Sequence, residues 1–437
     1  MLTVMAYSMV VVFMALIMTK RLAAVVALIV IPILFGLLAG FGVQIGPMMM
    51  DGIKKLAPTG VMLMFAILYF GIMIDAGLFD PVVRMILRLV GGDPMKVVVG
   101  TAALAMIVSL DGDGSTTYMV TAAALLPLYF RLGISRLVFA CVVMMAAHNM
   151  NLLPWGGPTA RAASALSLEM GDVFLPLLPA MVITGIWVLF VAYLLGLRER
   201  RRLGVMTLEV DPQHPEMSLV GGDPTLLRPK LLWFNFLLTV ALIGMLVWGK
   251  MPLPVLFMVG FAIAISVNYP NQQTQKERIA HHSENALPVV ALIFAAGIFV
   301  GILSGTKMVD AMADSVIRGV PTWMGPYMGL VTAVLSLPFT FFISNDAFYF
   351  GILPILAKTA VAYGFTPAEI ARASLIGQQV HLLSPLVAST YLLVGLAKVE
   401  FGDHQRYTML WAVSAAAVMM LAVFGLGIVP LVRHAGG

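Results

Sequence analysis

The chain repeats one pattern along its 437 residues, a long apolar stretch followed by a short polar connection. About 20 consecutive apolar residues carry a helix across the hydrocarbon core of a bilayer, so this pattern predicts transmembrane helices. Hydrophobic residues make up 61% of the chain and charged residues 11%, which excludes a water-soluble globule. The expected spans are Leu2–Met18, Ala23–Leu38, Leu56–Ile74, Val173–Leu195, Leu231–Trp248, Leu253–Val267, Leu287–Leu303 and Thr408–Leu431. We therefore predict an all-α integral membrane protein that crosses the inner (plasma) membrane several times.

Two polar segments interrupt apolar stretches of the chain, and the two stretches of the first pair are too short to cross a bilayer. The sequence DGDGST separates 97–110 from 117–130, and SNDA separates 323–343 from 348–363. A 14-residue helix such as either limb of the first pair reaches only about 21 Å, against a hydrocarbon core of about 30 Å. We expect a re-entrant hairpin at about 97–130 and another at about 323–363. Their polar tips would lie in mid-membrane, where protein or a water-filled cavity must surround them.

Each hairpin is followed by an apolar helix that breaks in its middle. Proline and glycine stop a helix within HNMNLLPWGGPT (148–159) and GQQVHLLSP (377–385). The expected broken helices run from about 136 to 170 and from about 368 to 400. Because NLLP in the first break resembles HLLSP in the second, the sequence predicts a duplicated unit.

The duplication divides the chain into a first repeat, 1–196, a proline-rich cytoplasmic linker, 197–230, and a second repeat, 231–437. The linker holds an arginine cluster, and placing it in the cytoplasm puts most of the 26 lysines and arginines on the inside. On that assignment the two repeats are inverted, as in secondary transporters whose broken helices meet at the midplane. The net charge of +5 then reports orientation, and no nucleic-acid partner is expected.

Ionisable residues at bilayer depth cost about 2.5 to 3.5 kcal/mol each on insertion scales, so they are candidates for function. Asp111 and Asp113 flank Gly112 in a turn that can aim both carboxylates at Mg²⁺ or Ca²⁺, and one of them can instead carry a proton. The alternative is that this turn only reverses the chain and caps the next helix. Asp346, in the second tip, completes the set of candidate metal ligands.

The other tip residues are Ser115, Thr116, Ser344 and Asn345, all of types that precede helices. Bare helix N-termini bind anions, so two such tips favour an anionic substrate, unless each side chain serves only its own helix. Arg161 is a candidate partner for a substrate carboxylate, or else part of a buried ion pair.

The remaining ionisable residues leave two interpretations open. His148 and His381 are candidates for proton coupling, or else hydrogen-bonded core residues. Asp75 falls at an expected helix end, which favours an interfacial position. The single cysteine, Cys141, excludes a disulfide framework and a thiolate cluster.

Six segments make the sequence recognisable: 65–81, 109–119, 151–164, 341–355, 370–374 and 380–397. They resemble the citrate/divalent metal:proton symporter family, and the similarity covers essentially the whole chain. The resemblance implies a homodimer in which each protomer has a scaffold part and a transport part that moves as an elevator. It also places substrate contacts at both tips and both helix breaks, at Ser115, Thr116, Asn149, Asn151, Gly156, Gly157, Thr159, Ser344, Asn345, Gln379, His381, Ser384, Ser389 and Thr390, beside the candidate Arg161.

The sodium-coupled relatives in the wider superfamily carry Ser-Asn-Thr at each tip, whereas here the tips read Gly-Ser-Thr and Ser-Asn-Asp. We therefore predict a symporter that takes up citrate as a complex with Mg²⁺ or Ca²⁺, together with protons. The metal belongs to the substrate, and no permanently bound cofactor is expected. The alternatives are a transporter of another di- or tricarboxylate or a cation:proton antiporter of the same fold. A membrane enzyme with a metal-phosphate site at DGDG is a further alternative, but the basic cluster that a diphosphate needs is missing there.

Overall fold

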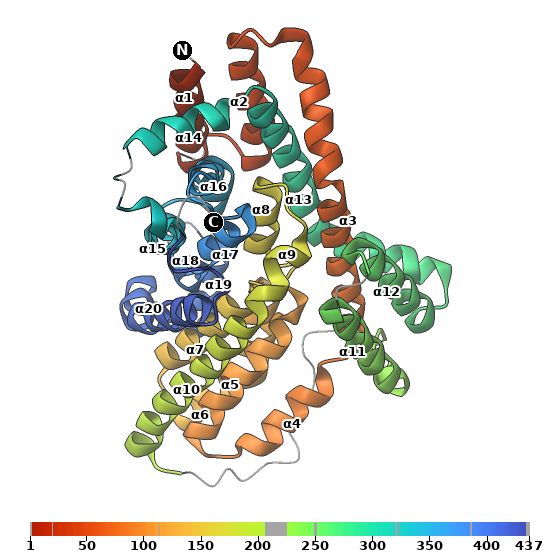
Figure 1. Ribbon diagram of the computed structural model, residues 1–437. Coiled ribbons are helices and arrows are strands. Elements are labelled where there is room, and N and C mark those ends of the chain that lie inside the picture. Colours follow the sequence, from red (N-terminus) through yellow and green to blue (C-terminus); the bar gives the residue numbers. More distant parts are fainter. Residues whose placement is uncertain are drawn as a thin grey trace.

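The computed structural model describes residues 2–19, 21–112, 114–205, 225–248, 251–319, 321, 323–384 and 387–433. Within these ranges every regular element is a helix, so the all-α prediction is confirmed (Figure 1). The helices of the first half are α1 Leu2–Met18, α2 Ala24–Leu38, α3 Ile45–Asp75, α4 Asp80–Val90, α5 Pro94–Val108, α6 Gly114–Leu132, α7 Arg136–Met150, α8 Gly157–Ala165, α9 Met170–Phe174 and α10 Leu178–Leu203.

The second half continues with helices of similar lengths and one short π-helix, η7. They are α11 Leu232–Trp248, α12 Leu253–Asn268, α13 Gln272–Gly305, α14 Met308–Gly319, α15 Met328–Phe342, η7 Ala347–Ile352, α16 Leu353–Val361, α17 Pro367–Leu375, α18 Gln378–His381, α19 Ala388–Ala397 and α20 Phe401–Gly425. A π-turn inside a helical segment often marks a functional site, and η7 directly follows the second polar tip.

Helices long and apolar enough to cross a membrane occur six times in the described ranges. They are Gly42–Asp75, Met170–Leu203, Pro229–Leu246, Gln272–Gly305, Gly325–Phe342 and Phe401–Gly425, and shorter apolar helices lie between them. One of the six, Gly325–Phe342, consists of a 3₁₀ turn and α15, and α15 is the first limb of the second expected hairpin. In the first expected hairpin, α5 has 15 residues and α6 has 19, so α6 is longer than the apolar pattern indicated.

The linker expected at 197–230 begins later than predicted, because α10 continues to Leu203. Two side chains hold the C-terminal end of α10. Arg202 donates to the carbonyl oxygen of Gly133 over 2.8 Å, and Glu199 accepts from the backbone N–H of Ser135 over 3.1 Å. These contacts fix the connection between α6 and α7. Residues 206–224 of the linker lie outside the described residues.

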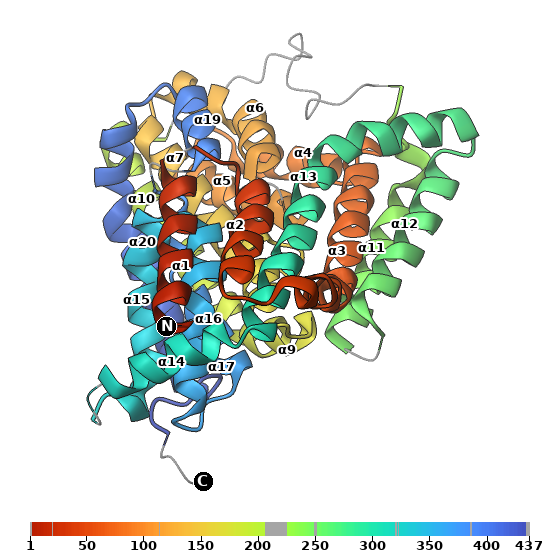
Figure 2. The same cartoon turned by 90° about the horizontal axis from the view of Figure 1, so that it is seen from above.

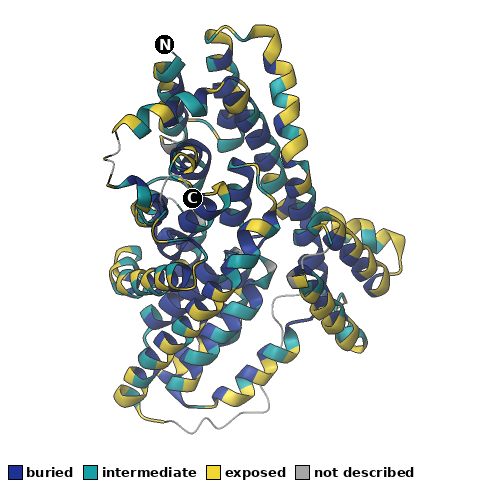
Figure 3. Cartoon of the chain, viewed as in Figure 1, coloured by how far each residue is buried: buried dark blue, intermediate teal, exposed yellow. Residues whose placement is uncertain are grey.

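Two hydrophobic cores organise the helices. One joins α1–α3 to α8, α9 and most of the second half, and the other joins α4–α7 and α10 to α18–α20. Figure 2 shows α11, α12 and α3 on one side of the molecule and α10 and α20 on the opposite side. Helices from the two ends of the chain therefore share each core. Buried residues concentrate where helices meet, and the outward faces of α11 and α12 are largely exposed (Figure 3).

The two longest helices, α3 and α13, touch backbone to backbone. A Cβ added at Gly52 would lie 1.9 Å from the carbonyl oxygen of Gly297, and one at Gly301 would lie 2.2 Å from the carbonyl oxygen of Met48. Small residues at such crossings let membrane helices approach closely. Any larger side chain at Gly52 would force α3 and α13 apart.

Candidate functional site

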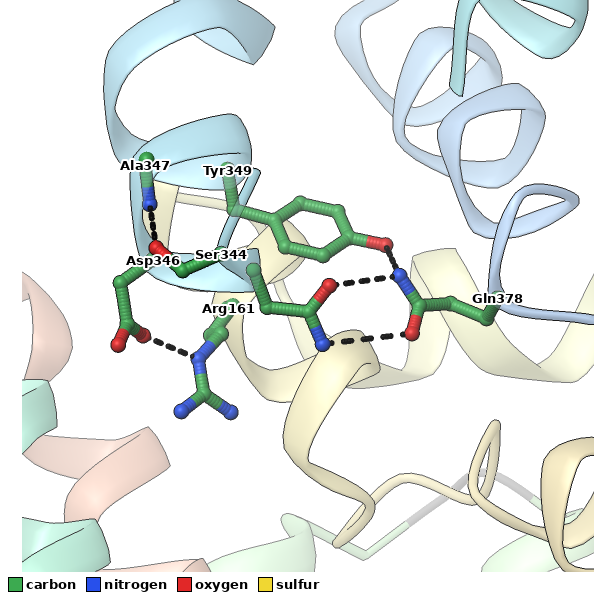
Figure 4. Close-up of polar contacts among 7 residues, drawn as sticks. Arg161, Ser344, Asp346, Ala347, Tyr349 and Gln378 are labelled. Carbon is green, nitrogen blue, oxygen red and sulfur yellow. Dashed lines mark hydrogen bonds and ion pairs between the residues drawn. The ribbon is translucent and has the colours of Figure 1, made fainter. Parts of the chain in front are cut away.

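The second polar tip, residues 343–346 between α15 and η7, carries a charged contact with the first half of the chain (Figure 4). Nε of Arg161, on α8, donates to Oδ1 of Asp346 over 2.6 Å. The two side chains keep 21% and 17% of their surface exposed, so the ion pair is accessible without lying on the open surface. A Cβ added at Gly157 would lie 2.7 Å from Nη1 of Arg161, so glycine at that position leaves room for the guanidinium.

Beside this ion pair, an amide pair joins the second tip to the second helix break. Nε2 of Gln378 donates to Oδ1 of Asn345 over 3.0 Å, and Nδ2 of Asn345 donates back to Oε1 of Gln378 over 3.3 Å. The same Gln378 nitrogen lies 3.0 Å from the hydroxyl of Tyr349 (Figure 4). Ser344 accepts from the backbone N–H of Ala347 over 3.2 Å, so it caps the helix that follows, as its residue type predicted.

The backbone of the first polar tip, between α5 and α6, makes a close contact with the first helix break. Nε1 of Trp155, from the first helix break, donates to the carbonyl oxygen of Leu110 over 2.8 Å. Gly112 has φ +81°, and a Cβ there would lie 2.7 Å from the Trp155 ring. Glycine is therefore required both by the left-handed backbone and by the packing. Ser109 and Thr117 share a hydrogen bond of 3.0 Å across the base of the tip.

Several predicted residues of the first tip cannot be placed. Asp113 and the side chains of Asp111 and Ser115 lie outside the described residues. The helix α6 begins at Gly114, so Thr116 lies in its first turn. A Cβ added at Gly114 would lie 3.8 Å from Oγ of Ser389, which brings the first tip next to the start of α19.

The other predicted residues of the two helix breaks bond mainly to backbone. Thr159 donates to the carbonyl oxygen of Leu152 over 2.8 Å, and Nδ2 of Asn149 donates to that of Met181 over 3.1 Å. In the second break, Thr390 donates to the carbonyl oxygen of Leu382. These bonds satisfy polar groups where the helices are interrupted. Asn151, Gly156 and Ser384 also lie in the breaks, and Ser384 is fully buried.

The two predicted histidines use different ring nitrogens in their hydrogen bonds. Nδ1 of His381 lies 2.6 Å from the carbonyl oxygen of Thr340. A carbonyl only accepts, so Nδ1 carries the hydrogen and Nε2 is the nitrogen that takes up a further proton. In His148 the basic nitrogen is engaged, because Nε2 accepts from the backbone N–H of Leu382 over 2.9 Å. Protonating His148 would break that bond, whereas protonating His381 would not break its bond to Thr340.

Two further observations concern the acidic residues and histidines that the structure describes. Among the described residues, no group of three or more His, Cys, Asp or Glu side chains is arranged to hold a metal ion. Asp75, at the end of α3, pairs with His282 at 2.7 Å and faces Arg278 at 3.7 Å. Asp75 therefore belongs to a separate ionic contact between α3 and α13.

Sequence reasoning missed three residues that the structure brings to these elements. Gln378, which the sequence analysis did not single out, contacts the second tip, whereas its neighbour Gln379 donates to Sδ of Met419 on α20. Trp155 belongs to the first helix break, but nothing near it in the sequence indicates its hydrogen bond to Leu110. His404 is buried on α20 beside Met144 and Thr408, and its only signal was being an ionisable residue near an apolar run.

Comparisons with known proteins identify what this arrangement resembles. A family model described as "Citrate transporter" matches residues 8–377. A citrate transporter of Bacillus subtilis (strain 168) is 58% identical over 98% of this chain and 100% of its own length. A Mg²⁺/citrate complex secondary transporter of the same organism is 52% identical over 99% of this chain and 100% of its own length.

Two solved structures share the fold. The YdaH transporter of Alcanivorax borkumensis superposes with a TM-score of 0.63 at 16% identity, covering 88% of this chain and 89% of its own. The MtrF efflux pump of Neisseria gonorrhoeae gives a TM-score of 0.62 at 14% identity, covering 90% of this chain and 86% of its own. At these identities the likeness concerns the fold alone.

Proposed function

The chain belongs to the citrate transporter family, a family of multi-pass membrane transporters and not of enzymes, and we propose that it takes up citrate complexed with a divalent metal, of the Mg²⁺ or Ca²⁺ type, together with protons. The relative at 52% identity, a transporter of the Mg²⁺/citrate complex, supports the metal-bound form of the substrate. Free citrate carries about three negative charges at neutral pH, whereas the complex keeps about one and costs less to remove from water.

The observation that carries this proposal is the Arg161–Asp346 ion pair. It presents a cation and an anion 2.6 Å apart, each partly accessible, at the junction of a helix break and a polar tip. A metal–citrate complex also has two ends, a metal ion and free carboxylates. When it binds, Asp346 turns to the metal and Arg161 turns to a carboxylate, so the substrate exchanges partners with the pair. Metal-free citrate offers nothing to Asp346 and is repelled by it.

In this proposal the other groups at the two breaks position the substrate. Uncharged donors and acceptors face the complex from two places. One is Asn345, which Gln378 holds, and the other is the start of α19 near Ser389. Asp111 and Asp113 remain candidate metal ligands. His381 carries the coupled proton, since its Nε2 takes up a proton without breaking the bond from Nδ1 to Thr340.

The proposed architecture is a pair of inverted repeats, 1–196 and 231–437, each with a re-entrant hairpin and a broken helix. The polar tips and breaks form a transport part that moves against a scaffold part, and two protomers assemble as a homodimer. The resemblance in fold to two other transporters is compatible with this arrangement.

Uptake of labelled citrate into proteoliposomes tests the proposal. We expect uptake to require Mg²⁺ or Ca²⁺ and an inward proton gradient, and to be insensitive to sodium. Metal, pH and sodium are varied one at a time, with protein-free liposomes as the blank. Sodium-driven uptake of metal-free citrate at the same rate would refute it. Competition by other di- and tricarboxylates would identify a broader substrate range, and metal-dependent proton movement without citrate would indicate an antiporter.

A further inference from the structure

The helix α4, Asp80–Val90, is too short to cross a membrane, and its two faces differ in character. Its 11 residues extend about 16 Å. Val83, Ile86 and Val90 are buried, and a Cβ added at Gly100 of α5 would lie 2.8 Å from Val90 and 3.0 Å from Ile86. The inner face of α4 is thus seated on α5. Figure 1 shows α4 at the lower edge of the molecule, between the end of α3 and α5.

The outer face of α4 combines exposed apolar and cationic side chains. Met85 is 53% exposed and Leu89 is 64% exposed, and Arg84 and Arg88 alternate with them. Together with Pro81 these residues line a groove of about 370 Å³. A helix that offers methionine, leucine and two arginines on one face is suited to the boundary between phospholipid headgroups and acyl chains.

The charges around this face favour an anionic partner. Asp80 is the acidic residue of α4, and it lies half-buried at the helix N-terminus, where burial raises the pKa of its carboxyl and Arg84 opposes that shift. Arg88 lies in the last turn of the helix. The helix that links α13 to α15, α14, differs, because it exposes Asp314 with Arg318 and pairs Asp310 with Lys358 at 2.9 Å. The cationic outer face is therefore a feature of α4 and not of both linking helices.

We propose that the outer face of α4 binds anionic phospholipids, with Arg84 and Arg88 on the headgroup phosphates and Met85 and Leu89 among the upper acyl chains. This helix connects α3, whose residues belong to one hydrophobic core, with α5, in the other core. Bound lipid anchors the connection between the two cores at the membrane surface. A soluble phosphate would find no use for the two apolar side chains, which is why a lipid is the expected occupant.

The test compares lipid binding to the purified full-length protein by native mass spectrometry, with phosphatidylglycerol and phosphatidylcholine as the two probes. A basic residue near the membrane surface strengthens anionic lipid binding about fivefold, so R84Q/R88Q is expected to bind phosphatidylglycerol about 25-fold more weakly. Binding of phosphatidylcholine should not change. The matched control is R201Q/K276Q, which removes two exposed cations from α10 and α13.

Equal phosphatidylglycerol affinity in the wild type and R84Q/R88Q, or an equal loss in R201Q/K276Q, would overturn the proposal. Inorganic phosphate that displaced phosphatidylglycerol at a concentration comparable to that of the lipid would show that the site recognises the phosphate alone. That result would also contradict the proposal. Elution of the variants as monodisperse protein on size exclusion confirms that they fold. Because no transport is measured, the result is independent of which substrate the protein carries.

Discussion

The two polar tips are built from the same kind of sequence but are held in different ways. The first tip is fixed by a tryptophan N–H on a carbonyl oxygen and by a glycine at φ +81°. The second tip is fixed by an ion pair and a reciprocal amide pair, Arg161–Asp346 and Gln378–Asn345. These contacts of the first tip are neutral, whereas those of the second tip are charged or strongly polar.

This difference indicates a division of labour, in which the two tips have different roles in substrate binding. Neutral contacts of about 1 kcal/mol each can hold a backbone turn without competing for a charged substrate. An ion pair, in contrast, is a contact whose partners a charged substrate can replace. We therefore expect the Trp155 contact to position the backbone of the first tip, and the ion pair of the second tip to respond directly to substrate.

The largest effect is expected at Arg161. R161Q leaves the Asp346 carboxylate without its cation in a site that is only about one-fifth exposed. An uncompensated charge in such a site costs about 3 kcal/mol, at the lower end of the range for fully buried pairs. We expect lower thermal stability in detergent and no measurable uptake of metal–citrate.

The double variant R161Q/D346N is the control for this prediction. It removes both charges, so it should recover most of the lost stability, while uptake should stay absent because neither end of the substrate finds its partner. A single R161Q protein that is as stable as the wild type and still transports would show that the pair neither holds the second tip nor contacts substrate.

The comparison of the tips also shows what the sequence can and cannot predict. Spans and helix breaks follow from local features, which are apolar length for the spans and Pro154 and Gly156 for the first break. Such features act within a few residues, so they can be read directly from the chain. In the structure α7 ends at Met150 and α8 begins at Gly157, with Pro154 and Gly156 between them.

Pairing between distant residues cannot be read in the same way. Arg161 and Asp346 are 185 positions apart, and the sequence left open whether Arg161 binds substrate or an acid of the protein. Gln378 and Gln379 are adjacent in a short helix, about 100° apart around its axis, and only the packing of α18 decides which one faces the tip. The charged and amide contacts of the second tip thus depend on tertiary structure.

An intermediate effect is expected from the adjacent glutamines. Q378A removes the hydrogen bonds to Asn345 and Tyr349 and leaves buried polar atoms unpaired, which costs about 2 kcal/mol. If Asn345 contacts substrate, calorimetry should show metal–citrate binding weakened about tenfold. Q379A is the matched control, since it changes an equally buried neighbour that contacts Met419. Equal losses of affinity in both variants would mean that the amide pair has no special part in binding.

The smallest effect is expected at the first tip, from W155F. Phenylalanine keeps ring contacts of the kind that Trp155 makes with Phe70 and Phe257, both at 5.1 Å between centroids, but it cannot donate to Leu110. The lost bond should cost about 1 kcal/mol of stability and loosen the turn before α6. A cysteine at Gly114, in a C141A background, should then react faster with a membrane-impermeant thiol reagent, and metal–citrate affinity should change little.

W187F is the control for this last comparison. Trp187 on α10 also donates its N–H, to Ser414 over 3.0 Å, but lies outside both tips, so W187F should lose similar stability without changing the labelling at Gly114. If W155F and W187F label at the same rate, the tryptophan does not hold the first tip. If W155F instead abolishes binding as R161Q does, the first tip contacts substrate as directly as the second, and the proposed division of labour is wrong. A modest, local effect of W155F beside a complete loss in R161Q is the outcome that the two sets of contacts predict, because Trp155 makes a neutral contact whereas Arg161 belongs to an ion pair whose partners the substrate itself can replace.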